Sequence, residues 1–303
     1  MPALKSYLSN TSWKRIAAGL VAILATLVFI QLNSSLPRLA VFWLLGLSFG
    51  FVLGRSRFCF VSGFGNFYIF RDGTMLKAII AGMLVATAGF AFIMYGWVPD
   101  PSSGTIPPGA HISPFGWYLV LAGFIFGLGM MLAGCCINGS LYRIGGGFVF
   151  ALIALTGVLL GMGVFLLTDQ VWIDHILALP RIWLPVYLGW PGAITLSVLL
   201  LLSSYLLVHL LQVRARNTAG SSVSAPPGQG NRTGLTLPGL YKRIFTENWP
   251  VMAGGLVLGT LNIVAYWQVD RPWGVTGEIQ RWAMILFDAV GLPVGEISGV
   301  PGT

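Results

Sequence analysis

The chain has 303 residues, of which 56% are hydrophobic and only 9% are charged, whereas an ordinary soluble domain carries about 25% charged residues. This composition excludes an ordinary soluble enzyme and indicates a protein embedded in a lipid bilayer. The net charge of +8 does not indicate a nucleic-acid partner, because no soluble segment carries a basic stripe interleaved with aromatic residues. The excess of Lys and Arg is instead typical of membrane topology.

Seven apolar runs approach or reach the length that spans a bilayer, roughly 17–25 residues. A further stretch, 173–188, contains charged residues and prolines and is typical of an interfacial or re-entrant segment, and 281–291 is too short to span alone. We therefore predict an all-α, polytopic integral membrane protein. The seven runs are 16–32, 39–53, 75–98, 115–133, 147–167, 191–211 and 250–267.

The distribution of basic residues predicts the orientation. With a cytoplasmic N-terminus, thirteen of the 17 Lys and Arg residues fall in inside loops, and the four outside are Arg38, Arg181, Arg271 and Arg281. This agrees with the positive-inside rule. The first run lacks a convincing small-residue cleavage site, so we expect a span rather than a cleaved signal. The sequence thus predicts a multi-pass protein of a cell inner (plasma) membrane.

A Ser-, Gly- and Pro-rich stretch at 214–240 has no apolar periodicity and is typical of a flexible linker. It divides the chain into a first membrane half, 1–213, a cytoplasmic linker, and an incomplete second membrane half, 241–303. A weak repeat crosses the linker, because 60–63 and 274–277 share a pattern and each follows an apolar run and an arginine. Membrane transporters are often built from such repeats with interrupted helices at matching positions.

Three cysteines lie in two glycine-rich clusters, each directly after an apolar run. Cys59 lies in Gly-Arg-Ser-Arg-Phe-Cys-Phe-Val-Ser-Gly at 54–63, and Cys135 and Cys136 lie in Leu-Ala-Gly-Cys-Cys-Ile-Asn-Gly at 132–139. Such segments break a helix at membrane depth, which is tolerated only where protein buries the break or water reaches it. We predict that the thiols line a path. The alternative is that each is a buried small hydrophobe, the common role of a free cysteine.

The same cysteines do not indicate a disulfide framework, because their number is odd and two are adjacent. They also lack the two-residue ligand spacing of a metal site, and no His pair accompanies them. We expect no metal and no cofactor.

Four segments carry motifs: Arg-Phe-Cys-Phe at 57–60, Phe-Arg-Asp-Gly at 70–73, Gly-Met-Met-Leu-Ala-Gly-Cys-Cys-Ile-Asn-Gly-Ser-Leu-Tyr-Arg-Ile-Gly at 129–145, and Arg-Pro-Trp-Gly-Val-Thr-Gly at 271–277. Together they resemble the YeeE/YedE family of sulfur-transport membrane proteins. The resemblance implies an inverted repeat of long and broken helices in which central cysteines pass thiosulfate through a narrow neck. It implies that Cys59 and Cys136 are pathway cysteines, whereas Cys135 stands where the family usually has glycine.

Two departures from the family pattern stand out. Gly146 replaces a residue that is usually acidic, and the family's last glycine-cysteine segment is absent before Thr303. From this we expect a truncated chain, a diverged member or a chain completed by another polypeptide.

Further candidate pathway residues flank the cysteines or lie in the second half. Asn138 either donates to an anion or satisfies backbone in a broken helix, and Arg57 either anchors the topology or contacts solute. The glycines permit turns or close approach and would contact solute only through their N–H groups. The complete predicted set is Cys59, Cys136, Cys135, Asn138, Gly63, Gly134, Gly139, Arg57, Thr276 and Gly277.

Two functions fit these residues. The first is transport of thiosulfate or a related small sulfur anion, because thiols are weak donors and polarizable partners for sulfur and helix N-termini receive oxyanions. The second is a sulfur relay, in which Cys59 or Cys136 becomes a persulfide and passes sulfur to a small thiol-bearing cytosolic carrier. A Walker motif is lacking, so we expect neither ATP hydrolysis nor another enzyme activity in this chain.

Overall fold

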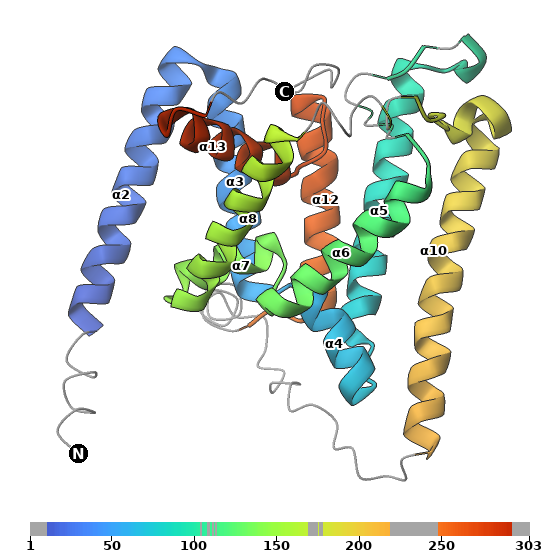
Figure 1. The fold of residues 1–303 in the computed structure, drawn as a ribbon, viewed down its shortest axis with the longest axis horizontal. Coiled ribbons are helices and arrows are strands. Elements are labelled where there is room, and N and C mark those ends of the chain that lie inside the picture. The colour runs from blue at the N-terminus through green and yellow to red at the C-terminus, as the bar shows by residue number, and fades with distance from the viewer. Residues whose placement is uncertain are drawn as a thin grey trace, which may run out of the picture. The chain divides into compact units, whose positions relative to one another are not determined.

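The structure, a computed structural model, describes residues 11–103, 105–107, 110, 112, 114–168, 175, 178–218 and 248–292. These residues form helices and irregular segments without a strand among them, which confirms the predicted all-α class. The chain divides into two units, Met1–Phe49 and Gly50–Thr303. The helices are α2 (Thr11–Ser35), α3 (Pro37–Ser56), α4 (Phe60–Phe70), α5 (Thr74–Trp97), α6 (Trp117–Ala133), α7 (Ile137–Gly145), α8 (Val149–Leu167), α10 (Leu184–Thr218), α12 (Val251–Val269) and α13 (Thr276–Ala289), with a short 3-10 turn η1 (Pro101–Ser103) (Figure 1).

Six helical segments are long and apolar enough to cross a membrane, and they correspond to six of the seven predicted runs. The run at 16–32 falls within α2, whose described apolar part, Gly19–Ser35, is shorter than these six. The six segments are Pro37–Phe70, Thr74–Trp97, Trp117–Gly145, Val149–Leu167, Leu184–Ala215 and Val251–Val269.

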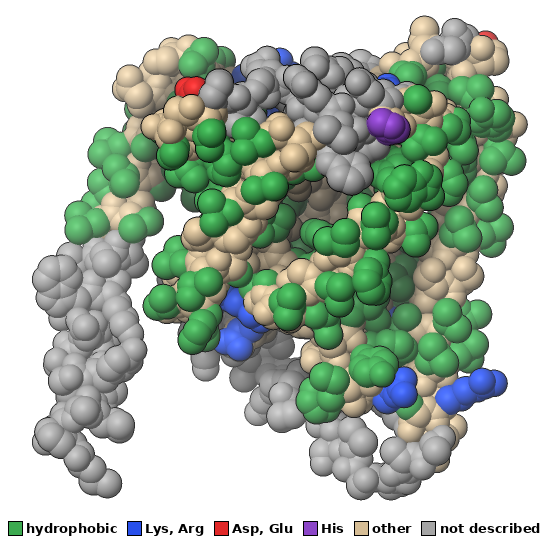
Figure 2. Space-filling view, viewed as in Figure 1, with side chains coloured by type: hydrophobic (Ala, Val, Ile, Leu, Met, Phe, Trp, Pro, Cys, Tyr) green, Lys and Arg blue, Asp and Glu red, His purple; other side chains and the backbone are tan. Residues whose placement is uncertain are grey.

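Large apolar side chains cover the outside of these helices. Leu132 is 90% exposed and Phe150 is 85% exposed, and Figure 2 shows hydrophobic side chains spread over the visible face with few basic ones among them. Extensive exposed apolar surface is unfavourable in water and marks contact with lipid or protein. The polytopic membrane class predicted from composition is thereby confirmed.

The unit Met1–Phe49 contains α2 and most of α3. α2 ends before Pro37, because the residue preceding a proline is disfavoured in helical geometry, and Pro37 itself suits the first position of α3. The Trp43 Nε1–H group donates to the Ala25 carbonyl at 3.1 Å. This bond ties the two helices together across the short turn.

The unit Gly50–Thr303 is organised around α5 and α12, which run side by side (Figure 1). A β-carbon at Gly82 would stand 2.5 Å from the Gly255 carbonyl oxygen, and one at Gly259 would stand 2.5 Å from the Gly82 oxygen. Small residues of this kind let membrane helices approach backbone to backbone. The abundance of glycine in the sequence therefore has a direct structural use here.

α10 is attached to both ends of α5. Near its start, the Trp190 Nε1–H group donates to the Val98 carbonyl at 2.8 Å. Near its end, the buried Gln212 donates through Nε2 to Asp72 Oδ1 at 3.3 Å. These two bonds hold α10 along α5 and place the turn between α4 and α5.

Two sequence boundaries differ from the structure. The predicted interfacial stretch ran to 188, but α10 already begins at Leu184 and is interrupted only at Gly189, whose φ is 66° and which Pro191 follows. The predicted linker began at 214, but α10 continues to Thr218. Residues 219–240 of that linker, together with 173, 174, 176 and 177, lie outside the described residues, and the three-part domain division stays a prediction.

Candidate functional site

The first cysteine lies in a break between two helices. α3 ends at Ser56, Arg57 has a left-handed φ of 49°, and α4 begins at Phe60. Cys59 is the N-cap residue of α4, with extended backbone, so the first N–H groups of α4 surround its position. The sequence prediction that the helix breaks at the Cys59 cluster is confirmed.

The second cysteine cluster lies in a similar break. α6 ends at Ala133, and Gly134 has a φ of 66°, a left-handed conformation that glycine adopts without steric penalty. Cys136 is the N-cap of α7, and its Sγ accepts from the Gly139 N–H group at 3.4 Å. The prediction that Gly134 permits a turn is therefore confirmed.

A cation bridges the break between α6 and α7. The Arg143 guanidinium donates through Nη1 to the Gly134 carbonyl at 3.0 Å. The carbonyl at the end of α6 would otherwise be one of the unsatisfied groups at a helix C-terminus. Arg143 thus holds the Gly134–Cys136 turn closed from the far end of α7.

The two breaks meet at their sulfur atoms. Cys59 Sγ lies 3.8 Å from Cys136 Sγ although 77 residues separate them in sequence. Cys59 is completely buried, whereas Cys136 is partly exposed. The N-termini of α4 and α7 therefore converge on one pair of free thiols.

Gly139 makes this approach possible. A β-carbon at this position would stand 3.1 Å from Cys59 Sγ, 3.2 Å from Cys135 Cβ and 3.5 Å from Cys136 Sγ. A side chain at this position would therefore press on Cys59 and Cys135 and come into ordinary contact with Cys136. The prediction of close approach at Gly139 is confirmed.

Cys135 has a different environment from the thiol pair. Its Sγ lies 3.1 Å from Ser140 Oγ and 3.5 Å from the Ala133 carbonyl oxygen. Ser140 also donates to the Cys136 carbonyl at 3.2 Å. The Cys135 side chain is thus held by Ala133 at the end of α6 and by Ser140 of α7.

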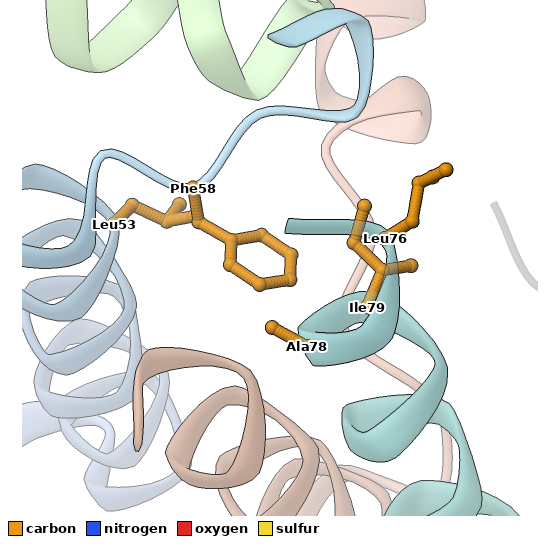
Figure 3. Packing of buried hydrophobic residues seen from close by; sticks show 5 residues of the cluster. All are labelled: Leu53, Phe58, Leu76, Ala78 and Ile79. Atoms are coloured by element: carbon orange, nitrogen blue, oxygen red, sulfur yellow. The ribbon is translucent and has the colours of Figure 1, made fainter. Parts of the chain in front are cut away.

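The motif of the second half approaches the first break through a hydrophobic cluster. We call it the Phe58 cluster; it consists of Leu53, Phe58, Leu76, Ala78 and Ile79. Figure 3 shows the Phe58 ring between Leu53 of α3 and the residues of α5. Trp273 packs against this cluster, and its backbone N–H donates to Asn262 Oδ1 at 3.0 Å. The segment after α12 therefore runs back along that helix toward Phe58, which directly precedes Cys59.

Residues 55–296, most of the chain, match the family described as Sulphur transport. The chain belongs to this family. The match confirms the resemblance read from the cysteine motifs. The family description is that of transport proteins rather than enzymes, as the sequence predicts.

Three relatives show the extent of the similarity. The thiosulfate transporter TsuA of Escherichia coli (strain K12) is 39% identical over 112 residues, 36% of this chain and 29% of the relative. The probable transporter YedE of Salmonella typhimurium (strain LT2) is 31% identical over 189 residues, 61% of this chain and 44% of the relative. TsuA of Spirochaeta thermophila is 34% identical over 122 residues, 40% of this chain and 34% of the relative. The chain thus matches less than half the length of each of these relatives.

The remaining predicted residues of this member of the Sulphur transport family lie at varying distances from the thiol pair. Gly63 donates its N–H group to the Cys59 carbonyl at 3.0 Å and packs against α5. Asn138 is partly buried in the first turn of α7, and Arg57 is exposed beside the first break. Thr276 and Gly277 are exposed at the start of α13. Their role in a pathway, and that of the cysteines, stays a prediction.

Two positioning residues were not singled out from the sequence. Ser140 lies four residues after Cys136, the N-cap of α7. Residues with this spacing are neighbours on a helix, so the sequence alone could have placed Ser140 beside Cys136. Asn262 is a polar residue inside the apolar run 250–267, a position where membrane helices use amides to bind neighbouring segments. Groups of three or more His, Cys, Asp or Glu side chains that could hold a metal do not occur in the described part of the chain.

Proposed function

We propose that this chain carries thiosulfate or a related small sulfur anion across the membrane, and that the solute passes Cys59 and Cys136. Its family is described as Sulphur transport, and two of its relatives are named thiosulfate transporters. The observation that carries the proposal is the 3.8 Å approach of the two sulfur atoms at the N-termini of α4 and α7.

The chemistry of the thiol pair suits such a solute. Thiosulfate is a dianion with a soft terminal sulfur and hard sulfonate oxygens. A thiol is a weak hydrogen-bond donor with a polarizable sulfur, and the free N–H groups of a helix N-terminus favour an oxyanion. Weak contacts of both kinds would bind the anion without trapping it, which conduction requires.

The burial of Cys59 means that the segments around the thiols move during transport. Cys59 has no exposed surface, so an anion reaches it only after one of the two breaks shifts. Gly134 lies in the break between α6 and α7, and hinge positions are commonly element-terminal residues that absorb backbone rotation. We assign the opening movement to this break.

The same burial favours transport over a sulfur relay. In a relay, a cysteine thiolate attacks the terminal sulfur of thiosulfate, forming a persulfide and releasing sulfite, and a carrier thiolate then attacks that persulfide. A protein carrier would need to reach the modified sulfur, but Cys59 is enclosed and Cys136 only partly exposed. Mass spectrometry after incubation with thiosulfate separates the two, because a stable persulfide on either cysteine supports the relay.

Uptake of radiolabelled thiosulfate tests the proposal in cells that lack their own importer and receive this chain alone. We expect uptake by the wild-type chain and its loss in Cys59→Ala and Cys136→Ala. Leu132→Ala is the matched control, because Leu132 lies in α6 beside the second break but is 90% exposed. Wild-type rates in both cysteine variants would refute the pathway role, and absence of wild-type uptake would refute transport by this chain alone.

We also propose that the N-terminus faces the cytoplasm of a cell inner membrane. The support is the excess of Lys and Arg in loops that this orientation places inside. Fusions of a reporter that is active on one side of the membrane, placed in the 219–240 stretch, test it. Reporter activity on the outer side contradicts the orientation.

A further inference from the structure

We infer that Cys59 and Cys136 form a redox modification site, at which a small-molecule disulfide reversibly converts the two thiols into an intramolecular disulfide. The two sulfur atoms are 3.8 Å apart, and a disulfide bond is about 2.05 Å long. Closing the remaining gap requires side-chain rotation and a small shift of one break.

Cys135 is excluded as the partner by its own contacts. Its Sγ points to Ser140 Oγ at 3.1 Å, and directly adjacent cysteines such as Cys135 and Cys136 rarely bridge. Gly139 of α7 adjoins both Cys59 and Cys136, and it has no side chain that would separate the two sulfur atoms. The fold therefore selects one pair out of three cysteines.

Burial sets the order of the two steps. Cys136 is partly exposed and Cys59 is completely buried, so a dissolved oxidant meets Cys136 first. The reactive species is the thiolate, and exchange proceeds through a mixed disulfide. Cys136 is the entry thiol and Cys59 the resolving thiol.

The reaction balances with a small disulfide, RSSR, as the oxidant. The Cys136 thiolate attacks one sulfur of RSSR, the S–S bond breaks, and one RS⁻ leaves and takes up the proton that Cys136 lost. The Cys59 thiolate then attacks Cys136 Sγ, and the second RS⁻ leaves and takes up the proton of Cys59. In total, two protein thiols lose two electrons and two protons, and RSSR becomes two RSH.

The disulfide would act on transport, and this consequence rests on the proposed function. It joins the N-terminus of α4 to that of α7 across 77 residues of chain, so the two breaks can no longer separate. It also removes both S–H donors from the proposed path. We expect oxidation to close the path and a dithiol reductant to reopen it.

Maleimide counting on the purified full chain tests the site without any transport measurement. The protein is incubated with glutathione disulfide, freed of excess reagent, denatured and labelled with maleimide. The wild-type chain has three cysteines, so we expect three adducts before oxidation, one after it, and three again after dithiothreitol. Peptide mapping should find the bond between Cys59 and Cys136.

Two variants distinguish the roles of the cysteines. In Cys59→Ser, we expect glutathione to remain on Cys136, because the resolving thiol is missing. In Cys135→Ser, we expect two adducts before oxidation and none after it. A bond that includes Cys135 in the wild-type chain, or three adducts that persist at millimolar glutathione disulfide, would overturn the proposal.

Uptake measurements separate this inference from the proposed function. Loss of thiosulfate uptake after oxidation and its recovery with dithiothreitol support closure of the path. Uptake that is unchanged while the Cys59–Cys136 bond is present overturns closure but leaves transport intact. If the wild-type chain shows no uptake, the proposed function fails, and the maleimide count still decides whether the modification site exists.

Discussion

Gly139 lies so close to Cys59 that a β-carbon at position 139 would stand 3.1 Å from the Cys59 sulfur. Gly139 belongs to α7, and Cys59 is the N-cap of α4. Because residue 139 is glycine and has no side chain, the two broken segments can approach each other this closely. Both the thiol pair and the proposed path depend on this contact.

Gly139→Ala should impair transport more than stability. The added methyl group forces Cys59 and Cys135 away from α7 by a few tenths of an ångström, and overpacking typically costs about 1–3 kcal/mol. We expect uptake to fall about tenfold, since about 1.4 kcal/mol corresponds to a factor of ten. Radiolabelled thiosulfate uptake, normalised to folded protein, measures this.

Gly145→Ala is the matched control for that substitution. Gly145 lies on the same helix, and a β-carbon there would meet nothing within 4 Å. Because alanine is a better helix former than glycine, we expect unchanged uptake and equal or higher stability. Equal losses of uptake in both variants would contradict the role given to the Gly139 contact.

Arg143→Ala should loosen the second break, between α6 and α7. It removes the 3.0 Å bond to the Gly134 carbonyl, and a hydrogen bond from a charged group contributes about 1.5–3 kcal/mol. We expect faster labelling of Cys136 by a membrane-permeant maleimide and lower uptake. Labelling of Cys136 at the wild-type rate would mean that the guanidinium does not hold the turn.

Gly82→Ala should destabilise the core of the protein. Its methyl group would stand 2.5 Å from the Gly255 carbonyl oxygen, so α5 and α12 must move apart. We expect a lower melting temperature in detergent, corresponding to about 1–3 kcal/mol. Gly96→Ala on the same helix is the control, because a β-carbon there would meet nothing within 4 Å; a similar loss in both would argue against tight α5–α12 packing.

Asp72→Ala should destabilise the attachment of α10. Asp72 Oδ1 accepts from Thr74 N and Thr74 Oγ1 at 3.1 and 2.6 Å and from Gln212 Nε2 at 3.3 Å. The substitution leaves the buried Gln212 amide without this acceptor, at a cost of about 1–3 kcal/mol. Thermal unfolding of the purified protein measures the loss.

Two further variants show whether that loss comes from the Gln212 bond. Asp72→Asn keeps an oxygen acceptor, so it should be the milder change. The double variant Asp72→Ala with Gln212→Leu should lose less than the sum of its single variants, because residues in one hydrogen-bond network are not additive. If the stability losses of the two single variants simply add in the double variant, Asp72 acts through Thr74 alone.

The sequence by itself determined the class of the protein and the places where its helices break. Long apolar runs specify spans because the bilayer core accepts no unsatisfied backbone polar groups, and six of the predicted runs form helices long and apolar enough to cross a membrane. The breaks at Cys59 and at Cys135 and Cys136 follow from local glycine and small-residue composition. Local chemistry of this kind can be read without knowing any long-range contact.

Helix boundaries were less accurate, because they depend on neighbours as well as on composition. α10 begins at Leu184, inside the stretch 173–188 that was predicted to be interfacial or re-entrant. It also extends to Thr218, beyond the last apolar residues of the run. Bonds from Trp190 and Gln212 to other segments hold this long helix in place.

Only the tertiary structure decided which of these residues meet. The contact between Cys59 and Cys136 spans 77 residues. The residues around either cysteine do not indicate that it contacts the other. The close packing of α5 on α12 through Gly82 and Gly255, and the packing of Trp273 on the Phe58 cluster, likewise join segments that are far apart in the sequence. Such contacts depend on shape complementarity between whole helices, which the order of residues along one segment does not encode locally.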